Sequence, residues 1–233
     1  KFPVKFVTHA HNGFRLAKCR NEGVLCSQAP YLLFTDGDCL LPPDHVSKHL
    51  KARRRGVAIA GNCIRFPPEV SERIHDEAVV SGEFLHWAPL NERWRFWQRA
   101  LRGLLYGSLR IPMRPRFSGN NIALWRSDFE KINGFDENYV GWGFEDVDLQ
   151  RRLARAGIRF QTILHRTRVY HLWHTPAPTF ARNGLRTTNR DYFLQAQPSR
   201  EQRCRNGLAQ TMLNNLRIRS WAARGQEHAT PSS

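Results

Sequence analysis

Tyr31-Leu32-Leu33-Phe34-Thr35-Asp36-Gly37-Asp38 is the stretch that decides the fold. Its first five residues are apolar or β-favouring and are bounded by a proline and a glycine, which predicts a buried strand. A segment of helical composition follows at 44–55, and Val57-Ala58-Ile59-Ala60 is a second apolar run that ends at a glycine. Strand, helix and strand at this spacing indicate a βαβ unit. We therefore expect an α/β fold with a parallel or mixed sheet.

The same patterns predict further elements on both sides of this unit. A helix is expected over Glu145 to Ala156, with Gly157 as its C-terminal stop. Ser127-Asp128-Phe129-Glu130 has the spacing of a capping box, which predicts the start of another helix. The remaining expected elements are a strand at 4–7, a helix at about 14–26, and strands at about 160–164 and 168–172.

Asp36 and Asp38 follow the first predicted strand, one residue apart. In open α/β sheets, ligands bind beyond the carboxyl ends of the strands, so both carboxylates can point into that crevice. Hard divalent cations prefer such oxygen ligands, and a cation there would hold the phosphates of a substrate. The alternative is an ordinary turn, because Asp-Gly is a common turn dipeptide.

The stretch Gly141-Trp142-Gly143-Phe144-Glu145-Asp146-Val147-Asp148 gives a predicted helix three carboxylates in its first turn. The helix dipole favours an ionised carboxylate there, which suits a general base. Ordinary acidic capping of the helix is the alternative. We favour function, because an exposed tryptophan between two glycines is typical of a platform on which sugar rings stack.

His171 and His174 follow the last predicted strand. Either imidazole can complete an oxygen-ligand metal site begun by Asp38. A lone histidine is more often structural, so spacing alone leaves both interpretations open.

The composition restricts the class of protein. The 233 residues are 41% hydrophobic and 24% charged, which supports a packed core and excludes a wholly disordered chain. No apolar run approaches the roughly 18 to 20 residues that a membrane-spanning helix requires. The five cysteines form no C-x-x-C pair, which argues against a disulfide scaffold or a zinc cage and indicates a reducing, cytosolic setting.

The charge is strongly basic, with a formal net charge of +16, which favours anionic partners. Residues 84–117 contain seven arginines and one carboxylate, Glu92. On a helical wheel, five apolar residues share one face (Trp94, Trp97, Leu101, Leu104, Leu105) and three arginines share another (Arg95, Arg99, Arg102). A basic amphipathic helix with tryptophans is typical of a segment that lies on anionic lipid, so Arg93–Arg116 is a candidate membrane contact. The alternative is that the apolar face packs on the core.

Three segments together resemble a known group of enzymes: YLLFTDGDCLLPPDHV at 31–46, FSGNNIALWRSDFEKINGFDENYVGWGFEDVDLQRRL at 117–153, and VYHLWH at 169–174. They resemble bacterial family 2 glycosyltransferases of the GT-A fold. The middle segment also resembles the C-terminal domain of animal β-1,4-galactosyltransferases and bacterial chondroitin polymerases. The resemblance covers about residues 13–178. It implies a Rossmann-like α/β domain that transfers a sugar from a nucleotide-sugar donor, with inversion.

The resemblance also assigns roles to the metal-binding and donor-binding residues. Asp36 and Asp38 match the D-x-D motif, and Asp38 is the more direct ligand of Mn²⁺ or Mg²⁺. His171 is the first choice for a further ligand and His174 the second. The implied donor and nucleotide contacts are Arg15, Arg20, Asn21, Asp36 and Asn120. A solvated helix face is an equally good interpretation of the two arginines.

Catalytic and acceptor-binding roles are implied for the glycine–tryptophan segment. Asp146 matches the catalytic base, which takes the proton of the acceptor hydroxyl. Glu145 matches its neighbour that contacts sugar. Trp142, with Gly143, matches the acceptor platform.

The resemblance and the patterns divide the chain into parts. We expect one GT-A domain with a mixed sheet over 1–178, carrying the amphipathic basic insertion at about 84–117. An Arg-rich helical extension is expected at 179–223 and a disordered tail at 224–233. Enzymes of this type begin with a strand-helix-strand unit that holds the nucleoside, and we expect this chain to start after that unit.

The sequence thus predicts a metal-dependent, inverting glycosyltransferase that uses a nucleotide sugar, with a UDP-sugar favoured. The acceptor is expected to be a glycan or lipid-linked hydroxyl in surface polysaccharide or lipopolysaccharide synthesis. The expected location is cytoplasmic, peripheral on the inner face of the cytoplasmic membrane. The alternatives are an inactive glycan- or membrane-binding remnant and a basic nucleic-acid-binding protein. The acidic motifs would repel nucleic-acid phosphates, so we expect no specific nucleic acid.

Overall fold

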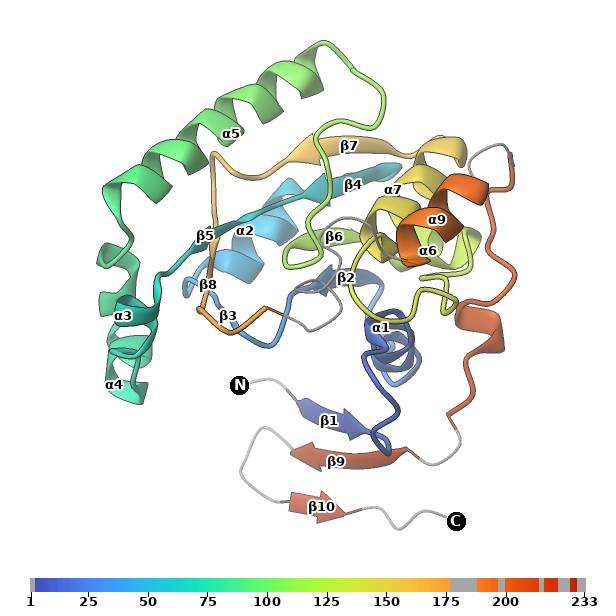
Figure 1. Ribbon diagram of the computed structural model, residues 1–233, viewed down its shortest axis with the longest axis horizontal. Helices are drawn as coiled ribbons and strands as arrows, with labels where there is room; N and C mark the ends of the chain where they lie inside the picture. The colour runs from blue at the N-terminus through green and yellow to red at the C-terminus, as the bar shows by residue number, and fades with distance from the viewer. Residues whose placement is uncertain (1–2, 177–187, 197–199, 214–215, 222–226, 230–233) are drawn as a thin grey trace.

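The computed structural model describes residues 3–176, 188–196, 200–213, 216–221 and 227–229. Figure 1 shows a central sheet covered by helices on both sides, with a long helix at one edge and a separate small sheet formed by the two ends of the chain.

The central sheet has four strands and is mixed. Its strands are β2 (Tyr31–Phe34), β6 (Ile122–Trp125), β4 (Val57–Ala60) and β7 (Arg159–Thr162), in that order. β6 is antiparallel to both β2 and β4, and β4 is parallel to β7. The β2–α2–β4 unit is therefore present, but β6 lies between its two parallel strands. β4 is buried along its whole length, whereas β2 is only partly buried.

Helices cover the two faces of this sheet in a pattern that follows strand alternation. On one face α1 (Leu16–Leu25), α6 (Arg126–Lys131) and α7 (Glu145–Arg155) pack on side chains such as Leu32 and Leu124. On the other face α2 (His45–Ala52) packs on Ile59 and Ala123. Because successive strand residues point to opposite faces, each strand contributes to both cores.

A three-stranded sheet extends the structure beyond the carboxyl end of β2. It consists of β3 (Cys39–Leu40), β8 (Val169–His171) and β5 (Cys63–Arg65), in that order. A second hydrophobic cluster lies between this sheet, α5 (Leu90–Ser108), α3 (Pro68–Ser71) and η1 (Glu83–His86). The short helix α4 (Asp76–Ser81) contacts η1.

The long helix α5 crosses the edge of the molecule beside β7 and β5. Phe96, Ala100 and Gly103 are its buried residues. A Cβ at Gly103 would lie 2.9 Å from Thr162, so this glycine permits the close approach of helix and strand. The apolar stripe of tryptophans and leucines faces elsewhere and is exposed: Trp94 58%, Trp97 51%, Leu101 46%, Leu104 39% and Leu105 54%. No helix within the described ranges is both long and apolar enough to span a membrane.

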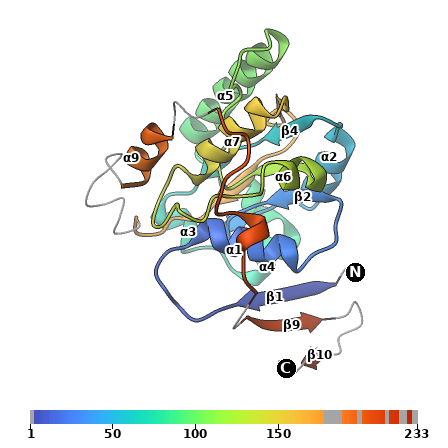
Figure 2. The same cartoon turned by 90° about the vertical axis from the view of Figure 1, so that its right-hand side faces the viewer.

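The two ends of the chain pair with each other, which the sequence did not predict. β1 (Val4–Thr8) does not join the central sheet, because it pairs with β9 (Arg217–Trp221), which also pairs with β10 (Glu227–Ala229). Figure 2 shows this sheet apart from the rest. The extension expected to be helical at 179–223 contains one described α-helix, α9 (Thr188–Gln195), a short turn η2 (Leu208–Gln210) and strand β9. Residues 227–229 of the expected disordered tail form a strand.

The capping box expected at Ser127 is wrong. α6 begins at Arg126 with Trp125 as its N-cap residue, and no side chain caps it. β6 extends to Trp125, which pairs with Tyr31, so the helix starts directly after the strand and Ser127 already lies in its first turn.

Candidate active site

The acidic pair lies at the carboxyl end of β2, where the chain crosses to the small sheet. Asp38 immediately precedes β3, and Cys39 pairs with His171 on the antiparallel strand β8. This register brings Oδ2 of Asp38 to 3.4 Å from Nε2 of His171 and to 3.3 Å from Nε2 of His174. The ligand atoms of the three residues lie within 4.8 Å of one another. Residues 133 positions apart in sequence thus form one cluster.

The donor set of this cluster fits a divalent cation. Nδ1 of His174 lies 2.8 Å from the carbonyl oxygen of Thr175, which only accepts hydrogen bonds, so this nitrogen carries the proton. In the neutral ring the lone pair of Nε2 then faces the Asp38 carboxylate, an arrangement that a cation between them stabilises. All three side chains are partly exposed, so a ligand can reach them. One carboxylate and two imidazoles form a mixed oxygen and nitrogen donor set for a divalent metal ion.

Asp36 lies outside this cluster, because its carboxylate turns towards Arg20. Nη2 of Arg20 donates to Oδ1 of Asp36 at 2.8 Å and to the carbonyl oxygen of Gly119 at 2.9 Å. Nη1 of Arg20 lies 3.4 Å from Oε1 of Glu145. A buried guanidinium from α1 thus joins the carboxyl end of β2, the 117–121 segment and the start of α7.

The loop before α7 has an unusual backbone. Gly141, Gly143 and Phe144 have φ values of +85°, +93° and +74°. Glycine adopts this region freely, but a phenylalanine there is strained, and such strain often marks functional sites. Phe144 is held by Phe193 of α9, with ring centroids 5.5 Å apart. The two successive left-handed residues turn the chain so that Glu145 and Asp146 stand at the N-terminus of the helix.

Asp146 is partly exposed and has the geometry of an accessible base. Its Oδ2 accepts a hydrogen bond from the N–H of Gly119 at 3.1 Å, and its Oδ1 accepts one from the N–H of Val147 at 2.8 Å. Burial raises the pKa of Asp146, while Arg20 and these N–H groups oppose the shift. A carboxylate whose pKa lies above its ordinary value is a stronger proton acceptor when ionised.

Glu145 is buried beside it. Burial, and then the charge of Asp146, raise the pKa of Glu145 to about 7, and Arg20 opposes this shift. Two adjacent carboxyl groups with different environments are a common arrangement for dividing acid and base roles.

The third carboxylate of this turn is structural. Asp148 is buried and accepts hydrogen bonds at 2.7 Å from both Arg151 and Arg152. Arg152 also donates to the carbonyl oxygens of Ile132 and Gly134. Asp148 therefore fixes α7 to the preceding loop, and Glu145 and Asp146 remain as the candidate catalytic carboxylates of this turn.

Three expected donor contacts have different surroundings. The expected contact of Asn21 with the nucleotide is corrected by the structure. Asn21 is fully buried, and its amide forms hydrogen bonds with the main chain of Phe135 and with Glu137, so no hydrogen-bonding edge remains for a nucleotide. Arg15 precedes α1 and donates to the carbonyl oxygen of Asn12. Asn120 is buried, and its Oδ1 has no hydrogen-bond partner within the described residues, so it can accept from a ligand.

Sequence reasoning missed residues that hold the loop before α7. Nδ2 of Asn189, on α9, lies 3.3 Å and 3.0 Å from the carbonyl oxygens of Trp142 and Gly143. Residues 179–223 were expected to form only a basic extension. No motif distinguishes Asn189, because its importance depends on packing across 46 residues. Gly119 was also missed, although it lies in a quoted segment.

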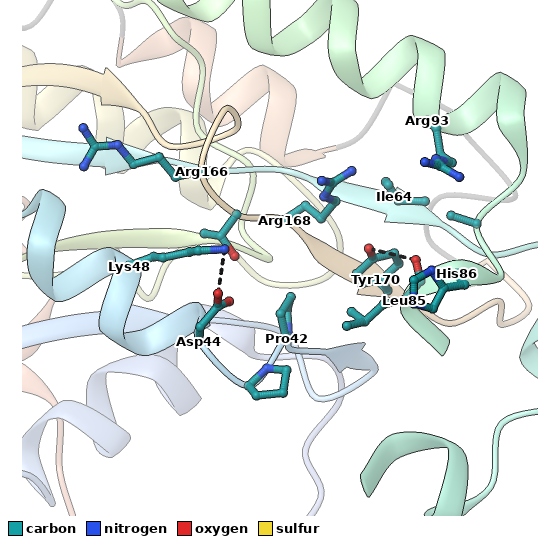
Figure 3. A pocket seen from close by; sticks show the side chains of 13 residues that line it. Pro42, Asp44, Lys48, Ile64, Leu85, His86, Arg93, Arg166, Arg168 and Tyr170 are labelled. Atoms are coloured by element: carbon teal, nitrogen blue, oxygen red, sulfur yellow. Dashed lines mark hydrogen bonds and ion pairs between the residues drawn. The ribbon is translucent and has the colours of Figure 1, made fainter. Parts of the chain in front are cut away.

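A cavity of about 450 Å³ lies away from these groups. Figure 3 shows that it is bordered by Lys48, Arg93, Arg168 and Tyr170, with Lys48 paired to Asp44 at 2.8 Å. Tyr170 and His171 are neighbours on β8 and point to opposite faces of the small sheet. The cavity therefore lies on the face opposite the Asp38 cluster and is separate from the candidate active site.

Comparison with known proteins identifies the family of the chain. The family model described as glycosyl transferase family 2 matches residues 1–128. The chain belongs to this family. A second model, described as the N-terminal domain of galactosyltransferase, matches residues 109–175, the segment that contains Gly119, Asp146 and His171. The α/β GT-A fold expected from the sequence is confirmed by this membership and by the mixed sheet.

Individual relatives of this family 2 chain cover different parts of it. Validoxylamine A glucosyltransferase of Streptomyces hygroscopicus subsp. jinggangensis is 30% identical over 168 residues, which are 66% of this chain and 39% of that protein. An uncharacterized glycosyltransferase of Bacillus subtilis is 28% identical over 195 residues, 69% of this chain and 48% of that protein. β-1,4-galactosyltransferase 4 of Mus musculus is 50% identical over 38 residues, 16% of this chain and 11% of that protein. The chain spans less than half the length of the first two.

Proposed function

We propose that this family 2 chain performs metal-dependent, inverting transfer of a sugar from a nucleotide sugar to an acceptor hydroxyl. The single observation that carries the proposal is the Arg20 bridge, which holds Asp36 beside Glu145 at the carboxyl end of β2. Arg20 also donates to the carbonyl oxygen of Gly119, whose N–H holds the candidate base Asp146, so the base and the candidate donor site are fixed to each other. The printed names of the relatives, a glucosyltransferase and a glycosyltransferase, support sugar transfer as the reaction class.

In the proposed mechanism, Asp146 accepts the proton of the acceptor hydroxyl. The hydroxyl oxygen then forms a bond to the anomeric carbon, and the bond from that carbon to the diphosphate oxygen breaks with its electron pair on the diphosphate. The N–H groups of Gly119 and Val147 orient Asp146, because each holds one of its carboxylate oxygens. Attack from the face opposite the leaving group inverts the configuration at the anomeric carbon.

Asp38, His171 and His174 would hold the divalent cation, Mn²⁺ or Mg²⁺. The cation would neutralise the charge that develops on the leaving diphosphate. Arg20 contributes a second, permanent positive charge on the Asp36 side. Asn120, with its unpartnered Oδ1, is proposed as a donor contact.

Trp142, Gly143 and Glu145 are proposed to bind the acceptor sugar. Trp142 is partly exposed in the loop that delivers the base. Glu145, whose pKa is raised to about 7, keeps a proton at neutral pH in a large fraction of molecules and can then donate a hydrogen bond to a sugar oxygen.

The proposed substrates and location are those expected from the sequence. A UDP-sugar is the proposed donor, and a glycan or lipid-linked hydroxyl in surface polysaccharide or lipopolysaccharide synthesis is the proposed acceptor. We place the protein in the cytoplasm, on the inner face of the cytoplasmic membrane. The support is the exposed tryptophan–leucine stripe of α5, with basic residues on the same helix.

Calorimetric titration with a panel of nucleotide sugars, with and without Mn²⁺, tests this function. One donor should bind in the presence of Mn²⁺ and lose most of its affinity when the metal is chelated. Asp38→Asn should remove the metal-dependent part. Asp44→Asn is the matched control, because Asp44 is an exposed carboxylate whose partner is Lys48. A folded chain that binds no donor under either condition would contradict the proposal.

A further inference from the structure

A second cavity, of about 310 Å³, lies where β4 and β7 end. Gly61 and Asn62 form one side, Thr162 forms the floor beside α5, and the segment 114–116 closes the other side. Figure 1 shows α5 running beside these strands before the chain returns towards the centre of the molecule. Nothing in the proposed function uses this cavity.

The lining of this cavity is strongly basic. Four of the twelve lining residues are arginines, and none is an aspartate or glutamate: Arg99, Arg102, Arg114 and Arg116. Arg99 is partly satisfied, since it donates to the carbonyl oxygen of Cys63 at 3.2 Å and lies 4.0 Å from Glu92. Within the described residues, Arg102 and Arg116 have no carboxylate in ion-pair distance. Like charges gathered in a hollow are stabilised by an anion that enters it.

The cavity is adjacent to the candidate base. The segment that lines it continues along α7: Gln150 donates to the carbonyl oxygen of Pro115 at 2.7 Å and accepts from the N–H of Phe117 at 3.0 Å. Gly119 then donates to Asp146. Gly119 is the third residue after Arg116, and an extended chain covers at most about 3.6 Å per residue. The Cα atoms of Arg116 and Gly119 therefore lie within roughly 11 Å of each other.

We propose that this arginine cavity binds the phosphate or diphosphate group of an anionic acceptor. The inference deepens the proposed function and rests on it. Guanidinium groups match phosphate oxygens with paired hydrogen bonds, and four of them suit a group with two or more charges. The donor diphosphate is assigned elsewhere, to Arg20 and the Asp38 cluster. A phosphate in the cavity would place the attached sugar within reach of Asp146.

The cavity in Figure 3 is the weaker candidate for this role. Asp44 contributes a carboxylate there and already neutralises Lys48. That cavity also lies on the opposite face of the small sheet, so a phosphate bound in it has no short path to the base.

Binding of inorganic pyrophosphate to the full chain, measured calorimetrically in the presence of a chelator, tests the proposal. The double variant Arg102→Gln, Arg116→Gln should bind at least about 10-fold more weakly, because two charge-assisted contacts are lost. Both side chains are exposed, so the variant should fold. The matched control is Arg54→Gln, Arg159→Gln, which removes the same charge at the opposite ends of β4 and β7 and should change the affinity less than about 2-fold. Equal affinity in the cavity variant and the unaltered chain would overturn the proposal.

Two further measurements separate the sources of phosphate. Metal-dependent nucleotide-sugar affinity should be unchanged in the cavity variant, and a loss there would assign the arginines to the donor and overturn the proposal. A soluble alkyl diphosphate should lose affinity together with pyrophosphate. If only binding to phosphatidylglycerol vesicles fell, the arginines would serve the membrane surface and the proposal would be wrong. Failure of the proposed function would give a different result from failure of this proposal, because the unaltered chain would then bind no nucleotide sugar.

Discussion

Nη2 of Arg20 lies 2.8 Å from Oδ1 of Asp36, so a residue of α1 holds the carboxylate at the end of β2. Only 7% of the Arg20 side chain is exposed, and the same guanidinium reaches Glu145. Burial of a charge is costly unless it is paired, and this one is paired twice. Arg20 is therefore part of both the stability and the electrostatics of the site.

Arg20→Gln should lower the free energy of unfolding by roughly 3 kcal/mol, because it leaves Glu145 and Asp36 without their buried countercharge. Urea denaturation measures the loss. It should also raise the pKa of Glu145 further, since Arg20 is the residue that opposes that shift. Arg54→Gln, on the surface, is the control and should change stability by less than about 0.5 kcal/mol. An Arg20 variant as stable as this control would show that the bridge is not maintained in solution.

Asp146→Asn should reduce the transfer rate by roughly 100-fold to 10,000-fold while donor affinity is retained, because asparagine cannot accept the hydroxyl proton. Rate and donor affinity are measured separately, by product formation and by calorimetry. The fold should be little affected, since Asp146 is partly exposed and asparagine keeps an acceptor for the N–H of Gly119.

Asp148→Asn, two residues further along the helix, is the matched contrast. It breaks the bonds to Arg151 and Arg152 and should cost roughly 3 kcal/mol of stability, while the folded fraction keeps its transfer rate. If both variants lost stability and neither lost rate per folded molecule, Asp146 would not be the base.

The contribution of Glu145 to the stability of the chain should fall as pH rises from about 4.5 to about 7. In the folded state the pKa of Glu145 is raised to about 7, whereas in the unfolded chain it has its ordinary value of 4.5. Below the lower value both states are protonated, so the contribution of Glu145 is fully present. Between the two values Glu145 has lost its proton in the unfolded state but retains it in the folded state. The contribution of Glu145 to stability therefore decreases as pH rises.

Glu145→Gln should remove this contribution, because glutamine does not titrate. Thermal unfolding followed at a series of pH values measures the slope for both chains. The difference between them should amount to a few kcal/mol at most across the interval. Parallel curves for the two chains would mean that Glu145 is ionised throughout.

Local patterns predicted the elements that carry the candidate base and the acidic pair. The apolar run 57–60 forms the buried strand β4, and Glu145 starts a helix that ends before Gly157, because periodicity and stop signals are encoded within a few residues. The joining of Asp38 with His171 and His174 was only a weak expectation from spacing. It required the register of β3 on β8, which pairs residues more than 130 positions apart.

Long-range pairing also explains the errors. Asn21 lies among basic residues of a predicted helix and was interpreted as a ligand-binding side chain. Its partners, Phe135 and Glu137, are more than 110 residues away, and nothing near Asn21 in sequence signals them. Two other features also depend on pairing between segments that are distant in sequence: β6 lies between β2 and β4, and β1 pairs with β9. Helix α5 was only partly predicted from the sequence, because it has three faces: one packed, one basic and one exposed and apolar.

The exposed stripe of α5 should bind anionic vesicles. Trp97→Ser with Leu101→Ser should reduce partitioning into vesicles of phosphatidylcholine and phosphatidylglycerol by more than about 10-fold, because each side chain loses apolar area that the bilayer would bury. Stability should change little, since both residues are about half exposed. Val46→Ser with Val80→Ser is the control, because these valines are at least as exposed, at 52% and 87%, but lie on α2 and α4. Co-sedimentation measures the bound fraction at low and moderate salt. Equal loss in both pairs, or none in either, would exclude the stripe as the membrane contact.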